Sequence, residues 1–548
     1  MYIRLTQHKV LTFSSFMLVL IVALSVSVYM VNKLPDEYRR WQGLTAMALM
    51  PLQSFQYGLS YNARANPGES RLAALGNIFR PAQVNINVAS QTPAHDIPIL
   101  LYHGIVQKPD RFSMTPETFA DQMFTLKKAG YHTITLADLQ AFMEGRKELD
   151  NKSFLLTFDD ARIDAYFGAD PILQAAGFTA VMYVATADSL HVLRPLPSYY
   201  IHEGLLGRMV RSGRWELGSH AIQETGGFVP IDAAGTQGNF LSNKMWLQNE
   251  GRLESDEEYR ARITRELAIS KRDLEDSFST PIDSMSFPFG DFGQQTKNYP
   301  ESEAVIEEIV RAHYTIAFRQ AWQTDSLYTS NYPGTDLLHL RRIEPATDWS
   351  GERVFDLIEN ARAKNIGEGL HDTFASNTGW KSYWGGFTLK DNRLNLRAGT
   401  TTTGSLTFWD GTHDWEDYSF GATIESRAGE YVSLLARYQN NENYLGCWFS
   451  DGTVKVQEKV DGVTRTLQTV RNPVGNPVGS GNYGVSVQGS TVECLQGSRL
   501  IASSSNISPA LSKGGIGITI WDPENAKAGV SVVSVDVTPA PTVVVLDQ

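Results

Sequence analysis

Four short motifs contain side chains of the kinds that carry out hydrolysis. His103 lies in LLYHG, Asp159 and Asp160 lie in LTFDDA, His220 lies in ELGSH, and Pro288 lies in SFPFGD. Adjacent carboxylates point in different directions, so one could bind a metal while the other faces a substrate. A histidine such as His220 could supply a second metal ligand, and a metal-bound water becomes a nucleophile near neutral pH. A second histidine, such as His103, could then protonate the leaving group.

Each of these motifs also has a purely structural interpretation. Asp159 or Asp160 could cap the helix that is expected to begin near Ala161. His103 could be an ordinary buried histidine beside an apolar strand. Their common position favours chemistry, because all four motifs fall at the ends of predicted strands, where β/α folds build their sites.

The segments that would position the motifs alternate between strand and helix patterns. Short apolar runs at Ile97–Tyr102, Phe154–Phe158 and Phe178–Ala185 predict buried strands, and helical periodicity lies between them. This alternation predicts a parallel sheet or a barrel of β/α units. A Gly-, Asn- and Gln-rich insertion is expected between Glu224 and Glu254, followed by a long amphipathic helix from Tyr259 to Phe278.

The chain changes character after about residue 366. Helical periodicity disappears, and short alternating runs such as Tyr418–Ile424 and Tyr431–Tyr438 are separated by turns rich in Gly, Asn and Asp. This pattern predicts an antiparallel β-sandwich.

Composition narrows the class of protein. The chain has 548 residues, 42% of them hydrophobic and 20% charged, which fits two or more globular domains. Its net charge of −12 argues against a nucleic-acid partner. Only two cysteines, Cys447 and Cys494, are present, and the sequence leaves open whether they are bonded.

The N-terminus contains an uncharged run from Val10 to Val31. About 20 apolar residues span a bilayer as a helix, so the run predicts a transmembrane anchor; a cleaved signal peptide is the alternative. Arg4 and Lys9 precede it, which suits a cytoplasmic N-terminus. The rest of the chain would then lie in the periplasm or at the cell surface, where a disulfide can form.

The order LLYHG, TFDD, GSH and FPFG resembles the NodB-type domain of polysaccharide deacetylases, carbohydrate esterase family 4. It is similar in particular to the branch that contains biofilm poly-N-acetylglucosamine deacetylases. The resemblance covers roughly residues 97–345. It implies a deformed (β/α) barrel and hydrolysis of acetyl groups, chiefly N-acetyl groups, on a polysaccharide. It also implies a divalent metal, commonly zinc, with cobalt, nickel or manganese as alternatives.

Carried over residue by residue, the resemblance implies a role for each motif. Asp159 would be the general base and His103 the general acid, while Asp160 and His220 would bind the metal. The substrate pocket would be lined by Tyr102, Phe287, Pro288 and Phe289.

The second motif departs from the family pattern of His-Ser/Thr-x-x-His, because Glu224 stands where the second histidine is expected. A carboxylate can bind zinc or a harder ion, so Glu224 is predicted as the third metal ligand. Further ligands could come from His191, His202 or Asp232, which are near only in sequence. The departure keeps two alternatives open. One is a non-catalytic polysaccharide-binding or assembly protein, and the other is a glycosidase that uses Asp159 with Glu224.

The C-terminal segment resembles concanavalin-like or laminin-G-like sandwiches and could be a carbohydrate-binding module. Most of its tryptophans are expected in the core, whereas Trp384 and Trp415 are the candidates for a sugar platform. The predicted division is an anchor at 1–31, a stem at 32–96, a deacetylase-like domain at 97–365, a sandwich at 366–540 and a tail at 541–548. The expected partners are a polysaccharide substrate, the membrane and a polysaccharide export machinery.

Overall fold

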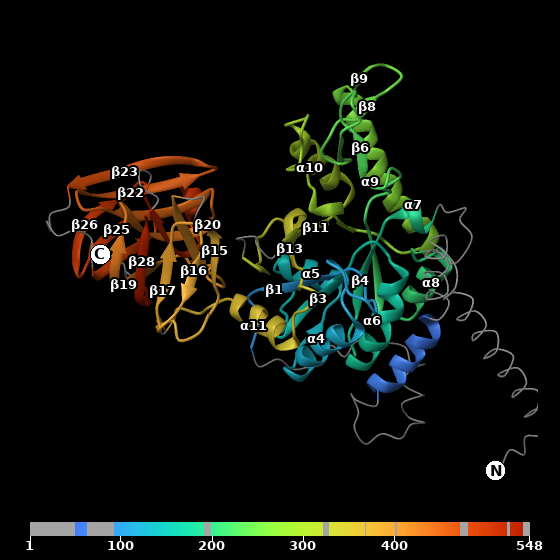
Figure 1. Cartoon of the computed structure of the whole chain (residues 1–548), viewed down its shortest axis with the longest axis horizontal. Helices are drawn as coiled ribbons and strands as arrows, with labels where there is room; N and C mark the ends of the chain where they lie inside the picture. The colour runs from blue at the N-terminus through green and yellow to red at the C-terminus, as the bar shows by residue number, and fades with distance from the viewer. Residues whose placement is uncertain are drawn as a thin grey trace, which may run out of the picture.

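The computed structural model describes residues 50–62, 92–190, 199–321, 328–367, 369–399, 403–471, 480–522 and 527–540. These residues form a barrel domain and, after it in sequence, a domain built mainly from strands (Figure 1). The predicted anchor at residues 10–31 and the tail at 541–548 lie outside this set. Within the described residues, no helix has the length and apolar character needed to cross a membrane.

Seven parallel strands form a closed barrel in the first domain. They follow one another around the barrel in the order β1, β13, β11, β10, β5, β4 and β3, and β3 pairs with β1 to close the ring. A (β/α) barrel was expected, and the structure confirms it. The strands are β1 (Ile97–Tyr102), β3 (Ser153–Phe158), β4 (Ala180–Val184), β5 (Trp215–Ser219), β10 (Ser284–Ser286), β11 (Ile316–Ala321) and β13 (Leu340–Ile343). Two short strands extend the sheet, β2 (His132–Thr133) beside β3 and β12 (Ser330–Asn331) beside β1.

Helices with well-formed ends connect the barrel strands. Thr135 and Ser255 each form a capping box, which satisfies free backbone N–H groups at the first turn. The predicted amphipathic helix begins at Asp256 and buries Tyr259 and Leu267 on one face. The helices are α4 (Pro116–Lys128), α5 (Leu136–Met143), α6 (Ile163–Ala176), α7 (Thr186–Ser189), α8 (Glu203–Arg211), α9 (Asp256–Phe278), α10 (Ser302–His313) and α11 (Gly351–Ala361).

The insertion before α9 folds into two small hairpins, which are β6 (Phe228–Pro230) with β7 (Gln237–Asn239) and β8 (Trp246–Leu247) with β9 (Arg252–Leu253). The buried Arg262 of α9 holds it in place. Its guanidinium donates to the carbonyl oxygens of Phe240 and Asn243 and to the Glu254 carboxylate. Residues 50–62, within the predicted stem, form a helix whose Tyr61 packs in the barrel core, so this part of the stem belongs to the first domain.

Two antiparallel sheets packed face to face form the second domain, which confirms the predicted sandwich. Strand β19 shows the expected alternation, with Tyr418, Phe420, Ala422 and Ile424 buried. One sheet contains β15 (Trp380–Trp384), β18 (Gly404–Trp409), β27 (Gly515–Trp521), β20 (Tyr431–Asn440), β21 (Asn443–Phe449), β22 (Thr453–Val460) and β23 (Val463–Arg471). The other contains β14 (Leu370–Asp372), β16 (Phe387–Leu389), β17 (Leu394–Arg397), β28 (Gly529–Pro539), β19 (Tyr418–Ala428), β24 (Gly481–Gln488), β25 (Thr491–Gln496) and β26 (Arg499–Ser504).

A disulfide joins the two sheets of the sandwich, from Cys447 on β21 to Cys494 on β25. It closes a loop with a sequence separation of 47 residues. Replacing both cysteines by alanine is expected to lower the free energy of unfolding of the sandwich by about 4 kcal/mol, because the unfolded chain regains the entropy of that loop. Denaturant titration of the double variant measures this. Equal stability of the variant and the oxidised parent would contradict it.

The two domains contact each other through Tyr328 and Tyr332 of the first domain. These rings pack in one cluster with Phe408, Leu435 and Tyr438 of the sandwich. The Tyr328 hydroxyl donates a hydrogen bond of 2.9 Å to the carbonyl oxygen of Tyr438. The sandwich is therefore packed against the barrel domain by the side of its seven-stranded sheet that faces away from the disulfide.

Candidate active site

The predicted motifs come together at one end of the barrel. In neighbouring strands β1 and β3, Tyr102 pairs with Phe158, so His103 and Asp159 leave the sheet at the same level. The backbone N–H of Asp159 donates to the carbonyl oxygen of Tyr102 at 3.1 Å. His220 directly follows β5, and Ser286 ends β10.

Asp159 is a buried carboxylate held by a buried arginine. Arg342 on β13 donates to both oxygens of Asp159 at 2.7 Å, and the Ser286 hydroxyl donates to one of them at 3.0 Å. Burial alone would raise the pKa of Asp159, but the charges of Arg342, His220 and His103 hold it well below the usual range. Asp159 is therefore ionised at neutral pH and fixed in one orientation.

Asp160 and His220 form a pair suited to a cation. Their Oδ1 and Nε2 atoms lie 3.5 Å apart, and the Asp160 side chain is 38% exposed. The other ring nitrogen of His220, Nδ1, lies 3.0 Å from the carbonyl oxygen of Ser286. A proton on Nδ1 that is donated to this oxygen leaves the lone pair of Nε2 directed toward Asp160, as a metal ligand requires. A carboxylate and an imidazole are donors that zinc and related divalent ions accept, so this pair fits a metal.

The structure does not bring Glu224 to this pair. Its side chain is 57% exposed and lies 3.7 Å from Arg265 of α9. The backbone explains this position. Gln223 has a φ of 61°, its N–H donates to Glu266, and its side chain donates to the carbonyl oxygen of His220. These contacts turn the chain after His220, so Glu224 does not lie with Asp160 and His220 in this structure, and its role as third ligand stays a prediction.

The ligands suggested by sequence proximity do not join the pair either. His202 precedes α8 as an exposed residue, and Asp232 binds the backbone N–H groups of Ala234 and Thr236 in an exposed turn. His191 lies outside the described residues.

His103 is held by a carboxylate that the sequence did not reveal. Its Nδ1 lies 3.0 Å from Oε1 of Glu344, the residue that follows β13. Burial lowers the pKa of His103, but the adjacent Glu344 carboxylate and the charges of Asp160 and Asp159 outweigh burial and raise it. The imidazole therefore favours its protonated form, as a general acid must.

The aromatic residues predicted for the substrate pocket are divided between core and surface. Tyr102 is buried and donates to Gln122 of α4, so it belongs to the core and not to the pocket. Phe287 and Pro288 are also buried. Phe289 is 40% exposed, and its ring lies 5.0 Å from that of Phe228 in the insertion. Of the predicted pocket residues, only Phe289 presents a large exposed ring.

Backbone strain marks the same end of the barrel. Within the described part of the barrel domain, six residues other than glycine have positive φ, and five of them adjoin the motifs: Asp160, Ala161, Ala221, Gln223 and Phe289. Such conformations cost about 1–3 kcal/mol each and gather at functional sites. The alternative that Asp159 or Asp160 merely caps α6 does not hold, because Arg162 occupies the cap position without a side-chain hydrogen bond.

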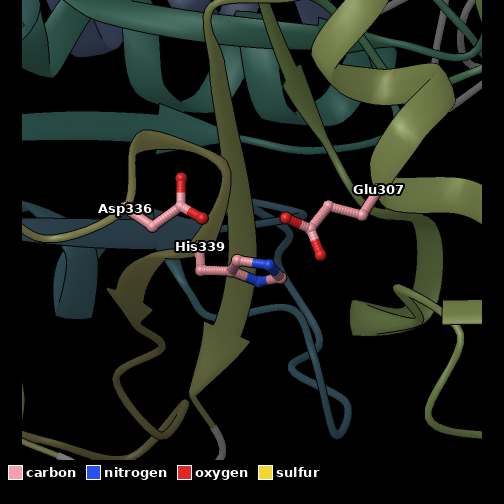
Figure 2. A group of neighbouring side chains, drawn as sticks. All are labelled: Glu307, Asp336 and His339. Atoms are coloured by element: carbon pink, nitrogen blue, oxygen red, sulfur yellow. The ribbon is translucent and has the colours of Figure 1, made fainter. Parts of the chain in front are cut away.

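A second cluster of metal-binding residue types lies elsewhere in the domain. Among the described residues, Glu307, Asp336 and His339 are the one set of three whose donor atoms all lie within 4.8 Å of one another (Figure 2). Arg311 forms ion pairs with Glu307 and Asp336 at 2.7 and 3.2 Å, so the protein itself supplies a cation there. This cluster contains none of the predicted site residues.

One family of known proteins matches the part of the chain that contains most of the motifs. Residues 146–304 match the family model described as polysaccharide deacetylase. This segment is similar to polysaccharide deacetylase domains. The match includes Asp159, Asp160, His220 and Ser286, whereas His103 and Arg342 lie outside it.

Two curated relatives and a solved structure are similar to parts of this chain. The chain is 27% identical over 145 residues to YxkH of Bacillus subtilis, whose name carries the same family description, covering 26% of this chain and 49% of that protein. It is 28% identical over 164 residues to the poly-beta-1,6-N-acetyl-D-glucosamine N-deacetylase of Escherichia coli, covering 28% and 24%. The deacetylase domain of BpsB from Bordetella bronchiseptica aligns with 23% identity and a TM-score of 0.37, over 46% of this chain and 96% of that one. The chain thus spans half or less of the curated relatives it matches.

Proposed function

We propose that this protein is a metal-dependent deacetylase that removes acetyl groups, chiefly N-acetyl groups of an amino-sugar polymer, from a polysaccharide outside the cytoplasm. The observation that carries the proposal is the ionised Asp159, locked by Arg342, beside the Asp160–His220 pair and the His103–Glu344 pair. A base, a cation site and an acid thus lie at one end of one barrel.

The residues divide the reaction between them. Asp160 and His220 would hold the metal, which when bound would acidify a water and polarise the acetyl carbonyl. Asp159 would accept the proton of the attacking water at a carboxylate oxygen, while Arg342 and Ser286 keep that carboxylate ionised and oriented. His103 would give its proton to the departing nitrogen, with Glu344 fixing the ring through Nδ1.

The proposal includes a location and a metal. The predicted anchor at residues 10–31 would hold the protein in the membrane, and the Cys447–Cys494 disulfide supports an oxidising compartment such as the periplasm or the cell surface. Zinc suits the carboxylate and imidazole donors, with cobalt, nickel or manganese as alternatives. A polysaccharide export machinery is the proposed partner.

The role of Glu344 predicts a shift in the pH dependence of acetate release. Glu344 raises the pKa of His103, and a general acid works only while protonated, so activity falls as the pH rises through that pKa. Replacing Glu344 by Gln should lower the pKa of His103. The alkaline limb of the pH profile of kcat/KM is therefore expected to move to lower pH. A pH profile of both proteins measures this, and an unmoved alkaline limb would contradict the assignment of His103 as the acid.

One alternative is a polysaccharide-binding protein that has the same fold but no catalytic activity. Because Glu224 is directed away from Asp160 and His220, the protein supplies two ligands where the family pattern supplies three. A weakened site would leave a polysaccharide-binding protein, and acetate release measured after chelation and after metal restoration distinguishes the two. The glycosidase alternative receives no support, since the Glu224 carboxylate that it requires is exposed and lies next to Arg265.

A further inference from the structure

The seven-stranded sheet of the sandwich has an inner and an outer side. Side chains directly opposite in antiparallel strands share a side. Cys447 pairs with Leu434 on the inner side, which carries the disulfide. Trp448 pairs with Ser433 on the opposite side, and we call this second side the outer face.

A row of aromatic rings crosses the outer face. It begins at the domain contact, where Tyr328 lies 5.1 Å from Phe408 and Phe408 lies 5.1 Å from Tyr438. It continues to Tyr444 and then Trp448, each step being 6.2 Å between ring centroids, with interplanar angles of 23° and 33°. Phe408 and Tyr438 are fully buried, whereas Tyr444 and Trp448 are partly exposed. The row thus emerges from beneath the barrel domain onto an open surface.

Glycines allow two tryptophans to approach the backbone closely on this face. A Cβ atom on Gly446 would come within 2.6 Å of the Trp448 indole, and one on Gly404 within 2.9 Å of the Trp384 indole. Each ring therefore lies close to the glycine backbone, and each is partly exposed. Trp521, which pairs with Gly404, adds a third indole that is 45% exposed.

Polar groups border the rings. By register, Lys455 lies opposite Trp448, Gln457 opposite Gly446, and Lys459 opposite Tyr444. Gln457 donates to the Thr466 hydroxyl at 2.8 Å, and Lys455 donates to the Tyr431 hydroxyl at 3.0 Å. Flat aromatic rings beside amide, amine and hydroxyl groups match a pyranose, whose C–H edges stack on a π face while its hydroxyl and acetamido groups form hydrogen bonds.

The other described tryptophans of the sandwich are buried and do not contribute to the outer face. Trp380 and Trp409 stack in the core with an interplanar angle of 4°. Trp415 is also buried, and its indole N–H donates to the carbonyl oxygen of Lys364, so its prediction as a platform residue is wrong. Trp384, the other predicted candidate, does lie on the outer face.

We propose that the outer face is a second, non-catalytic binding site for a neutral polysaccharide, with Trp384, Tyr444, Trp448 and Trp521 as its stacking surface. The occupant follows from continuity, because the aromatic row runs unbroken from the contact with the deacetylase domain. A glycan bound there would lie beside the domain whose proposed substrate is a glycan. The choice of polymer rests on the proposed function, whereas the site itself does not.

Affinity electrophoresis of the whole protein in gels containing poly-N-acetylglucosamine tests the site. The Trp384→Ala/Trp448→Ala variant is expected to bind the polymer at least tenfold more weakly than the parent. Its acetate release from short N-acetylglucosamine oligomers should be unchanged. Leu500→Ala, at an exposed apolar residue on the other sheet, is the matched control and should bind like the parent.

The outcomes separate this proposal from the proposed function. Parent-like polymer binding by the double variant would overturn the site, as would a parent that releases acetate but does not bind the polymer. Polymer binding that depends on the tryptophans, without acetate release, would keep the site and reject the deacetylase activity. If the double variant fails to fold, as judged by circular dichroism, Trp521→Ala removes one exposed ring and should still weaken binding several-fold.

Discussion

Replacing Asp159 by Asn is expected to reduce acetate release by about a thousandfold, since a positioned general base contributes roughly 10²–10⁴ in rate. Asparagine keeps the size of the side chain, but only its one carbonyl oxygen can still accept, and its NH2 group then faces an N–H group of the buried Arg342. It cannot take a proton from water at neutral pH. The change also leaves the buried Arg342 without its opposite charge, so we expect a loss of about 3–5 kcal/mol in the free energy of unfolding. The folded variant should still bind metal through Asp160 and His220, and acetate release is compared per folded protein. Acetate assays, thermal unfolding and metal analysis together measure this.

Glu224→Gln is the matched control for Asp159→Asn. Both changes neutralise a carboxylate of the predicted site, but Glu224 is exposed and lies next to Arg265. Its replacement should change acetate release by less than about threefold. The side chain does not lie with the predicted site residues, and the loss of an exposed ion pair has little effect on stability. Retention of most activity by Asp159→Asn would reject Asp159 as the base. A large loss in Glu224→Gln would show that Glu224 joins the site when the metal is bound.

Replacing Arg342 by Gln should have the second largest effect. Arg342 is fully buried and is the main opposite charge that holds the pKa of Asp159 low. Without it, burial raises the pKa of Asp159, so a larger share of the carboxyl groups is protonated at a given pH. Activity needs the ionised form, and its acid limb should therefore move to higher pH. At neutral pH we expect a loss of at least about a hundredfold.

The same change should also destabilise the barrel, by about 3–5 kcal/mol, because it leaves a buried carboxylate without its partner. Arg342→Lys keeps the positive charge but cannot form the bidentate contact with Asp159. Its stability and the position of its acid limb should therefore lie between those of the parent and those of Arg342→Gln. Denaturant titration and a pH profile of kcat/KM measure the two effects. An acid limb that stays in place in Arg342→Gln would contradict the role of Arg342.

Local sequence patterns predicted those site residues that directly follow a strand. Apolar runs end at His103, Asp159 and His220, and parallel strands place such ends together. Arg342 and Glu344 were missed because no motif marks the segment around β13. A charged residue within a buried strand was the available signal. The direction of Glu224 was also not predictable, because it depends on the positive φ of Gln223 and on the position of Glu266 in α9.

In the sandwich, alternation predicted the strands but not the role of each tryptophan. Trp380 and Trp384 lie on one strand at an even spacing, yet one is buried in the core and the other lies on the outer face. The register shift between Ser382 and Trp384 causes this difference. A bulge of this kind reverses the side of every later residue, and the sequence gives no sign of it.

The central claim is that the two-ligand cation site beside Asp159 supports hydrolysis, and acetate release tests it most directly. The purified protein would be treated with a chelator and incubated with N-acetylglucosamine oligomers and acetylated polysaccharides. The assay would be repeated with zinc, cobalt, nickel or manganese restored. We expect no release after chelation and recovery with at least one metal in the parent, but not in Asp159→Asn. A folded parent that releases no acetate with any metal or substrate would contradict the claim.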